Sequence, residues 1–207
     1  MGNAQQEREI RKAWSNGYFQ EKHETARLEV EKYMEEINDR YIEKNGNGFI
    51  RHMEARMKTP ESIIGKLERK SYAMDFATAE EKLNDLSGVR VICYSLKEIY
   101  WVAKQIARDE RYVIVKFKDY IRKPKKNGYE SYHIVLEVPV QMGDAEEKVR
   151  VELQLRTIIM DAWAAMDNRL SYKKANHISA EMERQVEKYA KIGRRLDKLI
   201  QRALDVT

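Results

Sequence analysis

The sequence predicts an α/β (α+β) domain in which a mixed sheet of four or five strands is flanked by helices. Both ends of the 207-residue chain repeat apolar residues at helical spacing, which is the first observation behind this fold class. The second is that the middle of the chain contains four short segments with strand character. The third is that a helical segment lies between the first two strands and another follows the last, so that strands and helices interleave.

The N-terminal part of the chain is predicted to be helical. Between residues 18 and 42 apolar side chains recur every three or four positions, and the sequence NGNG at 45–48 ends this helix. A second helix is predicted after Thr59, which can cap it, because Pro60 takes the first helical position and Glu61 lies in the first turn. The stripe that the first helix is expected to bury consists of Ala26, Val30, Tyr33, Met34, Ile37 and Tyr41.

Strands dominate the centre of the chain, and helices return after it. The predicted strands cover residues 88–94, 112–117, 130–140 and 148–156, with a helix at 96–107. Thr157 can cap a further helix, whose expected buried stripe is Ile159, Trp163, Met166 and Leu170. From about Ser179 a last long helix repeats Met182, Val186, Tyr189, Gly193, Leu196, Ile200 and Ala203. This last stripe can pack on the same chain or on a neighbouring one.

The composition excludes several classes of protein. Charged residues make up 35% of the chain, and no apolar run approaches the roughly 20 residues that span a bilayer. The N-terminus lacks the apolar stretch of a secretory signal, and the only cysteine, Cys93, excludes an internal disulfide and argues against zinc. We therefore expect a soluble cytoplasmic protein. The net charge of +5 suits a phosphate-rich ligand, but it equally suits a solvated surface with a small excess of lysine.

The first group of candidate functional residues surrounds the start of the second predicted helix. Arg56 and Lys58 precede this helix, Ser62 lies in its first turn, and Lys66 follows one turn later on the same face. The free N–H groups and the positive end of the helix dipole, together with these cations, form a cradle for polyphosphate. A surface helix with its lysines in solvent explains the same pattern.

Two carboxylates stand on or beside the predicted strands. Asp85 precedes the first strand, which carries Arg90, and Glu152 lies on the fourth strand between Arg150 and Arg156. Mg²⁺ prefers one or two carboxylates plus phosphate oxygens, and a carboxylate among arginines can also accept a proton. A turn aspartate and an ordinary half-exposed strand are the alternatives. Occurring together beside a basic helix start, the two carboxylates favour a phosphoryl-transfer site with one or two metal ions.

The third predicted strand begins with polar residues behind a basic loop. Strand alternation places Tyr129, Ser131 and His133 on one face and apolar residues on the other. That polar face is either a solvated surface or the floor of a site. The signatures G-x-x-x-x-G-K-[ST], G-x-G-x-x-G, H-R-D and H-E-x-x-H are absent from the sequence, which excludes a P-loop protein and a protein kinase.

Three long segments carry a resemblance to a known family. DLSGVRVICY, KDYIRKPKKNGYESYH and VELQLRTIIMDAWAAMDNRLSYK resemble the synthetase domain of the RelA/SpoT family, specifically its stand-alone small alarmone synthetases. The resemblance implies one domain over residues 1–207, with a nucleotidyltransferase-like synthetase core at 48–175, a helical extension at 1–47 and a C-terminal helix at 176–207. It further implies transfer of the β,γ-pyrophosphate of ATP to the ribose 3′-OH of GDP or GTP, giving ppGpp or pppGpp and AMP in the stringent response.

The resemblance also assigns roles to individual residues. The residues that match ATP-binding positions are Arg56, Lys58, Ser62, Lys66 and Arg90. Asp85 matches a magnesium-binding aspartate, and Glu152 matches the glutamate that activates the acceptor hydroxyl or shares the metal, so that both are the expected catalytic residues and Mg²⁺ is the expected cofactor. Tyr129 matches the tyrosine that stacks on the acceptor base. The other residues on the acceptor side are His133, Gln154 and Arg156.

The sequence departs from the family on the acceptor side. The family pattern Gly-Tyr-Arg-Ser has Glu130 in place of its arginine, and the pattern Trp-Ala-(Ser/Thr)-x-Glu-His ends here in Asp167 and Asn168. Glu130 alternates to the opposite side of the strand from Tyr129, so its side chain is expected to point elsewhere. The departures leave open a related toxin that pyrophosphorylates the 3′ end of tRNA or makes an adenosine alarmone.

The candidate partners differ between these hypotheses. A tRNA enzyme needs a basic path, which residues 122–126 with Lys173 and Lys174 can begin. A catalytically silent RNA- or nucleotide-binding module is a third hypothesis, against which the pair Asp85 and Glu152 argues. Small synthetases of the family often form tetramers through their terminal helices, whereas the toxins are often neutralised by an antitoxin. The four histidines are scattered singly, so no His-Asp pair of a hydrolase is visible.

Overall fold

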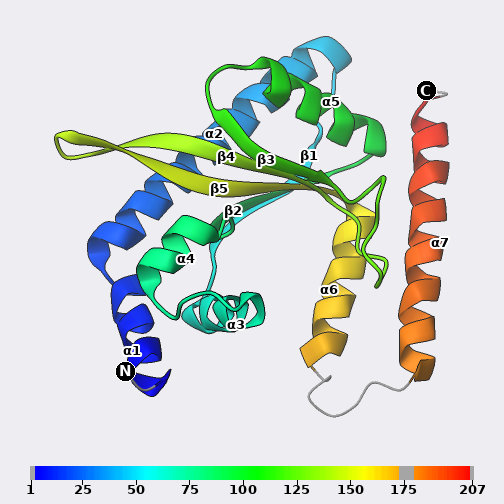
Figure 1. Cartoon of the computed structure of the whole chain (residues 1–207). Helices are drawn as coiled ribbons and strands as arrows, with labels where there is room; N and C mark the ends of the chain where they lie inside the picture. The colour runs from blue at the N-terminus through cyan, green and yellow to red at the C-terminus, as the bar shows by residue number, and fades with distance from the viewer. Residues whose placement is uncertain (1–2, 173–179, 206–207) are drawn as a thin grey trace.

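A five-stranded mixed sheet forms the centre of the molecule (Figure 1). The computed structural model describes residues 3–172 and 180–205. The strands are β1 (Ile50–Met57), β2 (Ser87–Cys93), β3 (Val113–Asp119), β4 (Tyr132–Met142) and β5 (Ala145–Thr157). Their order is β1-β2-β5-β4-β3, and β2 pairs with β5 in parallel whereas the other neighbours are antiparallel. The predicted fold class is confirmed, and the four predicted strands are present with ends shifted by a few residues.

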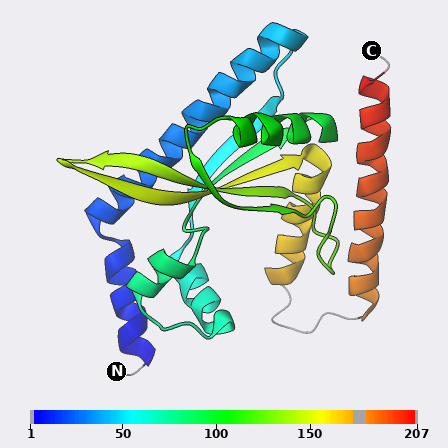
Figure 2. The same cartoon turned by 45° about the horizontal axis from the view of Figure 1, so that its top comes forward.

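Helices surround this sheet on both faces (Figures 1 and 2). They are α1 (Asn3–Trp14), α2 (Gly17–Asn45), α3 (Pro60–Lys70), α4 (Phe76–Lys82), α5 (Leu96–Arg108), α6 (Ile158–Tyr172) and α7 (Ala180–Leu204). The first predicted helix corresponds to α2, which ends where Gly46 adopts a left-handed φ of 79°. The second corresponds to α3, because the Thr59 hydroxyl accepts a hydrogen bond from the Ser62 N–H at 3.3 Å.

The sequence does not predict β1 or α4. The strand β1 reads IRHMEARM, lies at the edge of the sheet and exposes half of its side chains, so it lacks the apolar run of the other strands. The helix α4 has only seven residues, which is too short for a helical period to stand out. Both elements carry weak periodicity because much of their surface remains in solvent.

The main core lies between the sheet and the helices α2 and α5. Val89 and Val91 of β2 and Leu153 of β5 are buried there against Val30 of α2 and Ile99 of α5. Strand side chains alternate, so the even-numbered residues of β2 and β5 face the opposite side of the sheet. This opposite face carries the polar residues that the sequence singled out.

A second core supports the N-terminal end of α3. It joins α1, α3 and α4, and its buried residues are Ile10, Ile63, Ile64, Leu67, Ala79, Leu83 and Leu86. Because the apolar face of α3 is anchored in this cluster, its polar face with Lys66 is held beside the sheet. Among the described residues no helix has the length and apolar character needed to cross a bilayer.

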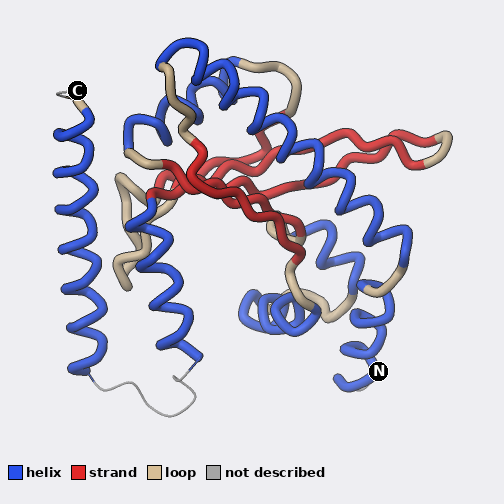
Figure 3. Tube along the Cα trace, turned by 180° about the vertical axis from the view of Figure 1, so that it is seen from behind, coloured by secondary structure: helices blue, strands red, loops and turns tan. Residues whose placement is uncertain are grey.

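The helices α6 and α7 run side by side at one end of the sheet (Figures 1 and 3). Trp163 and Ala164 of α6 are buried together with Ala190 of α7. The predicted burial of Met166 is wrong, since its side chain is 46% exposed. The packed face of α6 instead runs through Met160, Trp163 and Ala164, because α7 and the sheet lie on that side.

The helix α7 turns small and polar residues toward α6 rather than its large apolar ones. Ala190 and Asp197 are buried, whereas several large apolar side chains of α7 are substantially exposed. The exposed ones are Tyr189, Ile192, Leu196, Leu199 and Leu204. The predicted stripe is therefore only partly covered by the described residues of this chain: Val186, Gly193 and Ile200 are partly buried, whereas Tyr189, Leu196 and Ala203 are exposed. Ser179, Lys173, Lys174 and the side chain of Met182 lie outside the described residues.

Candidate active site

The pairing of all five strands places polar residues, most of them predicted, in two rows across one face of the sheet. One row runs through Arg56, Gly88 and Glu152. The next row runs through Arg90, Gln154, His133 and Lys118. A Cβ atom on Gly88 would lie only 3.3 Å from the main-chain oxygen of Glu152. Glycine therefore allows β2 and β5 to approach, and it leaves no side chain between Arg56 and Glu152.

These rows form the floor of a cavity of about 350 Å³. One wall comes from α3 with Lys66, and the other comes from α6 and the loop before β4. The predicted residues that line the cavity are Arg56, Lys66, Asp85, Arg90, Tyr129, His133, Glu152, Gln154 and Arg156. Lys58 reaches the same site through its contact with Asp85, whereas Ser62 is exposed in the first turn of α3 and does not line the cavity.

On one side of the cavity, Asp85 is held between two lysines. Its Oδ2 lies 3.1 Å from Lys58 Nζ, and its Oδ1 lies 2.7 Å from Lys66 Nζ. Burial alone would raise the pKa of Asp85, but the two ammonium groups outweigh it and hold the pKa below its usual value. The Lys58 N–H also donates to the Leu86 carbonyl at 2.8 Å, which fixes the end of β1 beside Asp85. This side is therefore a compact ion-pair cluster.

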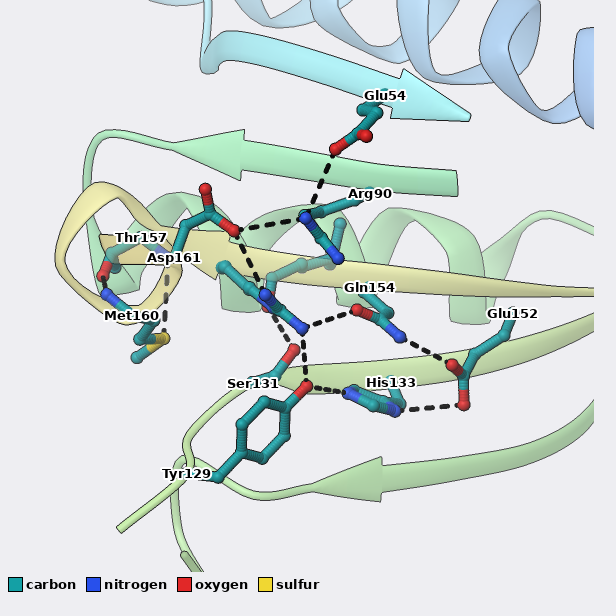
Figure 4. A network of polar contacts seen from close by, with 12 residues as sticks. Glu54, Arg90, Tyr129, Ser131, His133, Glu152, Gln154, Thr157, Met160 and Asp161 are labelled. Carbon is teal, nitrogen blue, oxygen red and sulfur yellow. Dashed lines mark hydrogen bonds and ion pairs between the residues drawn. The ribbon is translucent and has the colours of Figure 1, made fainter. Parts of the chain in front are cut away.

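Arg90 and Arg156 are held by a carboxylate that the sequence analysis did not single out. Asp161 lies in the first turn of α6, where a carboxylate is favoured by the helix dipole. Its Oδ1 is 3.1 Å from Arg156 Nη1 and 3.6 Å from Arg90 Nη1 (Figure 4). Glu54 of β1 approaches Arg90 from the other side at 3.3 Å. Both guanidinium groups are thus oriented before any ligand binds.

The acceptor-side residues form a closed ring of hydrogen bonds (Figure 4). The Tyr129 hydroxyl lies 2.8 Å from His133 Nε2, and His133 Nδ1 lies 3.1 Å from Glu152 Oε1. Gln154 Nε2 donates to Glu152 Oε2 at 2.7 Å. Arg156 Nη2 closes the ring, because it donates at 2.8 Å both to Gln154 Oε1 and to the Tyr129 hydroxyl. The five side chains hold one another in place.

Both hydrogen bonds that reach Glu152 in this ring are donated to its carboxylate. An ionised carboxylate only accepts, so His133 donates through Nδ1 and presents Nε2 as the acceptor for the Tyr129 O–H. Burial opposes ionisation of Glu152, but the hydrogen bonds from His133 and Gln154 outweigh it and keep its pKa below the usual value. Glu152 is therefore a carboxylate at neutral pH and is available as an acceptor.

Tyr129 reaches the ring from a loop rather than from a strand. The expected strand face of Tyr129, Ser131 and His133 is corrected here, because β4 begins at Tyr132 and the buried Ser131 hydroxyl donates to the Leu155 carbonyl. The ring of Tyr129 packs against the edge of Trp163, with centroids 6.2 Å apart. Lys125 lies 4.6 Å from the centroid of the Tyr129 ring, and Arg156 lies 5.2 Å from it.

The loop and strand before Tyr129 supply further cavity residues that sequence reasoning missed. Lys118 comes from the end of β3, and Tyr120 contacts the rings of both Tyr129 and His133. Lys125 belongs to the basic segment 122–126, but its position over two tyrosine rings depends on how the loop folds back. No local sequence pattern predicts that course.

The positions that depart from the family pattern have defined contacts. The Glu130 side chain is buried and forms an ion pair with Arg194 of α7, and it does not line the cavity. The prediction that it points away from the site is confirmed. Asp167 and Asn168 line the cavity, and Asp167 accepts a hydrogen bond from Asn127 Nδ2 at 3.1 Å. The loop before Tyr129 is thereby tied to α6.

A mixed sheet with a cationic helix start, two carboxylates in one polar cavity and an aromatic platform defines a phosphate-handling nucleotide enzyme. Residues 55–177 match a family model described as a region found in RelA/SpoT proteins. The chain belongs to this family of synthetases.

Relatives and solved structures agree with this membership. The chain is 37% identical to the GTP pyrophosphokinase YwaC of Bacillus subtilis over 78% of its own length and 77% of the relative's, and 30% identical to YjbM of the same organism over 78% and 75%. The structure resembles the small alarmone synthetase 2 of B. subtilis with a TM-score of 0.82 and 33% identity, covering 94% of this chain and 100% of the other. It resembles small alarmone synthetase 1, bound to its product pppGpp, with a TM-score of 0.82 and 27% identity over 90% and 94%.

Proposed function

We propose that this protein transfers the β,γ-pyrophosphate of ATP to the ribose 3′-OH of GDP or GTP, giving ppGpp or pppGpp and AMP. Membership of the RelA/SpoT family and the names of its relatives support this activity. The observation that carries the proposal is the arrangement of one cavity. Lysine-paired Asp85 lies on one side of it, the Tyr129 platform lies on the other, and Glu152 faces the same space.

The ATP side works by positioning and by charge. Lys58 and Lys66 are paired with Asp85 but remain partly accessible, so they are free to turn to the triphosphate oxygens. Arg56 and Arg90 flank the adenine, as in the family pattern. Arg90 stays oriented by Asp161 and Glu54 while it does so.

The carboxylates fit a magnesium ion. Asp85 Oδ1 is buried beside Lys66 Nζ at 2.7 Å, and Glu152 faces the same cavity. Mg²⁺ needs only one or two carboxylates from the protein, since it completes its shell with phosphate oxygens and water. Asp85 and Glu152 would hold the ion, and when bound it would neutralise charge on the phosphate oxygens.

The acceptor side orients the nucleophile. The guanine base stacks on Tyr129, and the 3′-oxygen attacks the β-phosphorus of ATP. A new bond forms between O3′ and the β-phosphorus, the bond from that phosphorus to the bridging oxygen of the α-phosphate breaks, and AMP leaves with the bridging oxygen. The proton of the hydroxyl passes to Glu152, which is ionised because of its lowered pKa.

The exposed apolar residues of α7 favour self-association. Tyr189, Ile192, Leu196 and Leu199 follow one another at alternating spacings of three and four, the pattern of a helix–helix seam. We propose that this seam joins copies of the chain in a homotetramer. Leu196→Glu would then lower the mass measured by light scattering to that of a smaller species. A wild-type monomer in that measurement would contradict self-association and leave the seam to another partner, such as an antitoxin.

The decisive experiment offers several acceptors to one labelled donor. ATP labelled on its terminal phosphate is incubated with Mg²⁺ and the protein, together with GDP, GTP, ATP or deacylated tRNA in parallel. Label on GDP or GTP with release of AMP is the expected result. Label on tRNA alone or on ATP alone would show that this molecule, and not a guanine nucleotide, is the acceptor. Label on none of them would overturn the proposed activity.

A further inference from the structure

The residue after the platform tyrosine is fastened to the C-terminal helix. The Glu130 side chain is only 8% exposed and forms an ion pair with Arg194 Nε of α7. A buried carboxylate without a partner is strongly unfavourable, so the pair restrains the main chain beside Tyr129. In the family pattern this position is an arginine, whereas here the cation comes from α7.

The residue before Tyr129 touches the same helix. Gly128 has a φ of +85°, which disfavours other residues, and a Cβ atom there would overlap the methyl group of Ala190. The same Cβ would lie 3.7 Å from the indole of Trp163. Gly128 therefore contacts α7 directly and the Glu130 side chain is ion-paired to it, so both neighbours of Tyr129 are attached to that helix.

A third contact reaches the other end of the hydrogen-bond ring. The Thr157 hydroxyl donates to Asp197 Oδ2 of α7 at 2.9 Å and accepts from the Met160 N–H at 3.1 Å. Thr157 follows Arg156, whose guanidinium donates to the Tyr129 hydroxyl. The helix α7 thus holds the neighbours of both Tyr129 and Arg156, although none of its described side chains lines the cavity.

We propose that Glu130 and Arg194 are positioning residues for the acceptor nucleotide: through them α7 fixes the Tyr129 platform against Arg156. This inference rests on the proposed guanosine acceptor. It assigns the C-terminal helix a role in acceptor binding and none in ATP binding, because its described side chains hold the neighbours of Tyr129 and Arg156, whereas Asp85 is paired with Lys58 and Lys66. Glu130 does not line the cavity, so its pairing with Arg194 acts on the acceptor only through the position of Tyr129.

Steady-state kinetics with each substrate varied separately tests this role. Arg194→Met removes the charge and keeps the length, and Glu130→Gln is isosteric. We expect each to raise the KM for GDP or GTP about tenfold, the effect of losing one charged hydrogen bond, and to leave the KM for ATP unchanged. The matched control is Arg195→Met, since Arg195 is exposed on the same helix. The double exchange Glu130→Arg with Arg194→Glu is expected to restore most of the acceptor affinity.

Two kinetic results would overturn the inference. One is an unchanged acceptor KM in a folded Arg194→Met protein. The other is a parallel loss for both substrates that the double exchange does not repair, because that describes general destabilisation. If the wild-type protein transfers nothing to guanine nucleotides, the proposed function fails. Hydrogen exchange can then still test whether the pair of Glu130 and Arg194 holds the loop in place. Faster amide exchange at residues 120–131 in Arg194→Met, but not in Arg195→Met, supports it, and equal exchange contradicts it.

Discussion

The two sides of the cavity are built in different ways. The proposed ATP side is a set of ion pairs between residues on or next to regular elements, with Asp85 between Lys58 and Lys66. The acceptor side is a ring of hydrogen bonds, completed by a loop tyrosine that α7 holds in place. The lysines can leave Asp85 for phosphate oxygens when ATP binds. The side chains of the ring, by contrast, already hold one another in the arrangement proposed for acceptor binding. One side therefore relies on its charges to attract a ligand, and the other relies on side chains that are fixed in position.

Glu152 is where the two sides meet, so its substitution should have the largest effect. Glu152→Gln keeps the shape and an acceptor oxygen for His133, but it cannot take a proton. We expect the transfer rate to fall about 1,000-fold, within the range of general-base catalysis. Single-turnover kinetics measures this, with ATP binding and thermal stability as controls. A loss smaller than about tenfold would show that Glu152 is not the base.

Tyr129 distinguishes stacking from the hydrogen-bond ring. Tyr129→Ala removes the platform and is expected to raise the acceptor KM roughly tenfold to 100-fold, the usual worth of one stacked base. Tyr129→Phe keeps the ring and loses only the bonds to His133 and Arg156, so a smaller rise is expected. The KM for ATP should not change in either variant. Equal effects of the two substitutions would assign Tyr129 a purely hydrogen-bonding role.

Lys66 tests the ATP side alone. Lys66→Met removes one of the two cations on Asp85 and one triphosphate ligand. We expect the KM for ATP to rise about tenfold, as for one charged hydrogen bond, while the acceptor KM stays constant. Titration of ATP at fixed GDP, and the reverse, separates the two. A rise in the acceptor KM of the same size would mean that the two sides are not independent.

Asp197 tests the support behind the acceptor side through stability rather than activity. Burial raises the pKa of its carboxyl to about 6, so the folded state binds an extra proton and stability falls as the pH rises from about 4 to above 6. Asp197→Asn can still accept from Thr157 and carries no charge. At pH 8 we expect the free energy of unfolding, measured in urea, to be roughly 2–3 kcal/mol higher for this variant than for the wild type. At pH 4 we expect no difference. A gain independent of pH would exclude titration of Asp197 as the cause.

The sequence predicted the parts of the fold and site that depend on local patterns. The alternation in β2 and β5 placed Arg90, Glu152 and Gln154 on one face, and the cap at Thr59 placed Lys66 beside that face. These positions follow from regular geometry. Ser62 shows the limit, since it shares the helix start but does not line the cavity.

The rest of the site depends on contacts between distant segments. Asp161 binds Arg90 only because α6 folds back toward β2, and Lys125 reaches Tyr129 only through the course of its loop. Glu130 lies in the loop before β4 and Arg194 lies in α7, so no periodicity in the sequence predicts their ion pair. For α7, apolar spacing indicated a packing stripe, but its most buried side chains are Ala190, which packs with Trp163 and Ala164 of α6, and Asp197, which accepts a hydrogen bond from Thr157.

The parallel pairing of β2 with β5 has a consequence for how the chain acquires activity. The acceptor ring lies almost entirely on the β4–β5 hairpin and its preceding loop, which can form early because its contacts are local. Gly88 and Glu152, by contrast, are paired across 64 positions of the chain. Closing that long loop is slow, and only then do Lys58 and Lys66, the proposed phosphate ligands, come beside Glu152, the proposed base. During refolding, transferase activity should therefore return at the rate of the slowest folding phase. The recovery of activity then reports when β2 pairs with β5.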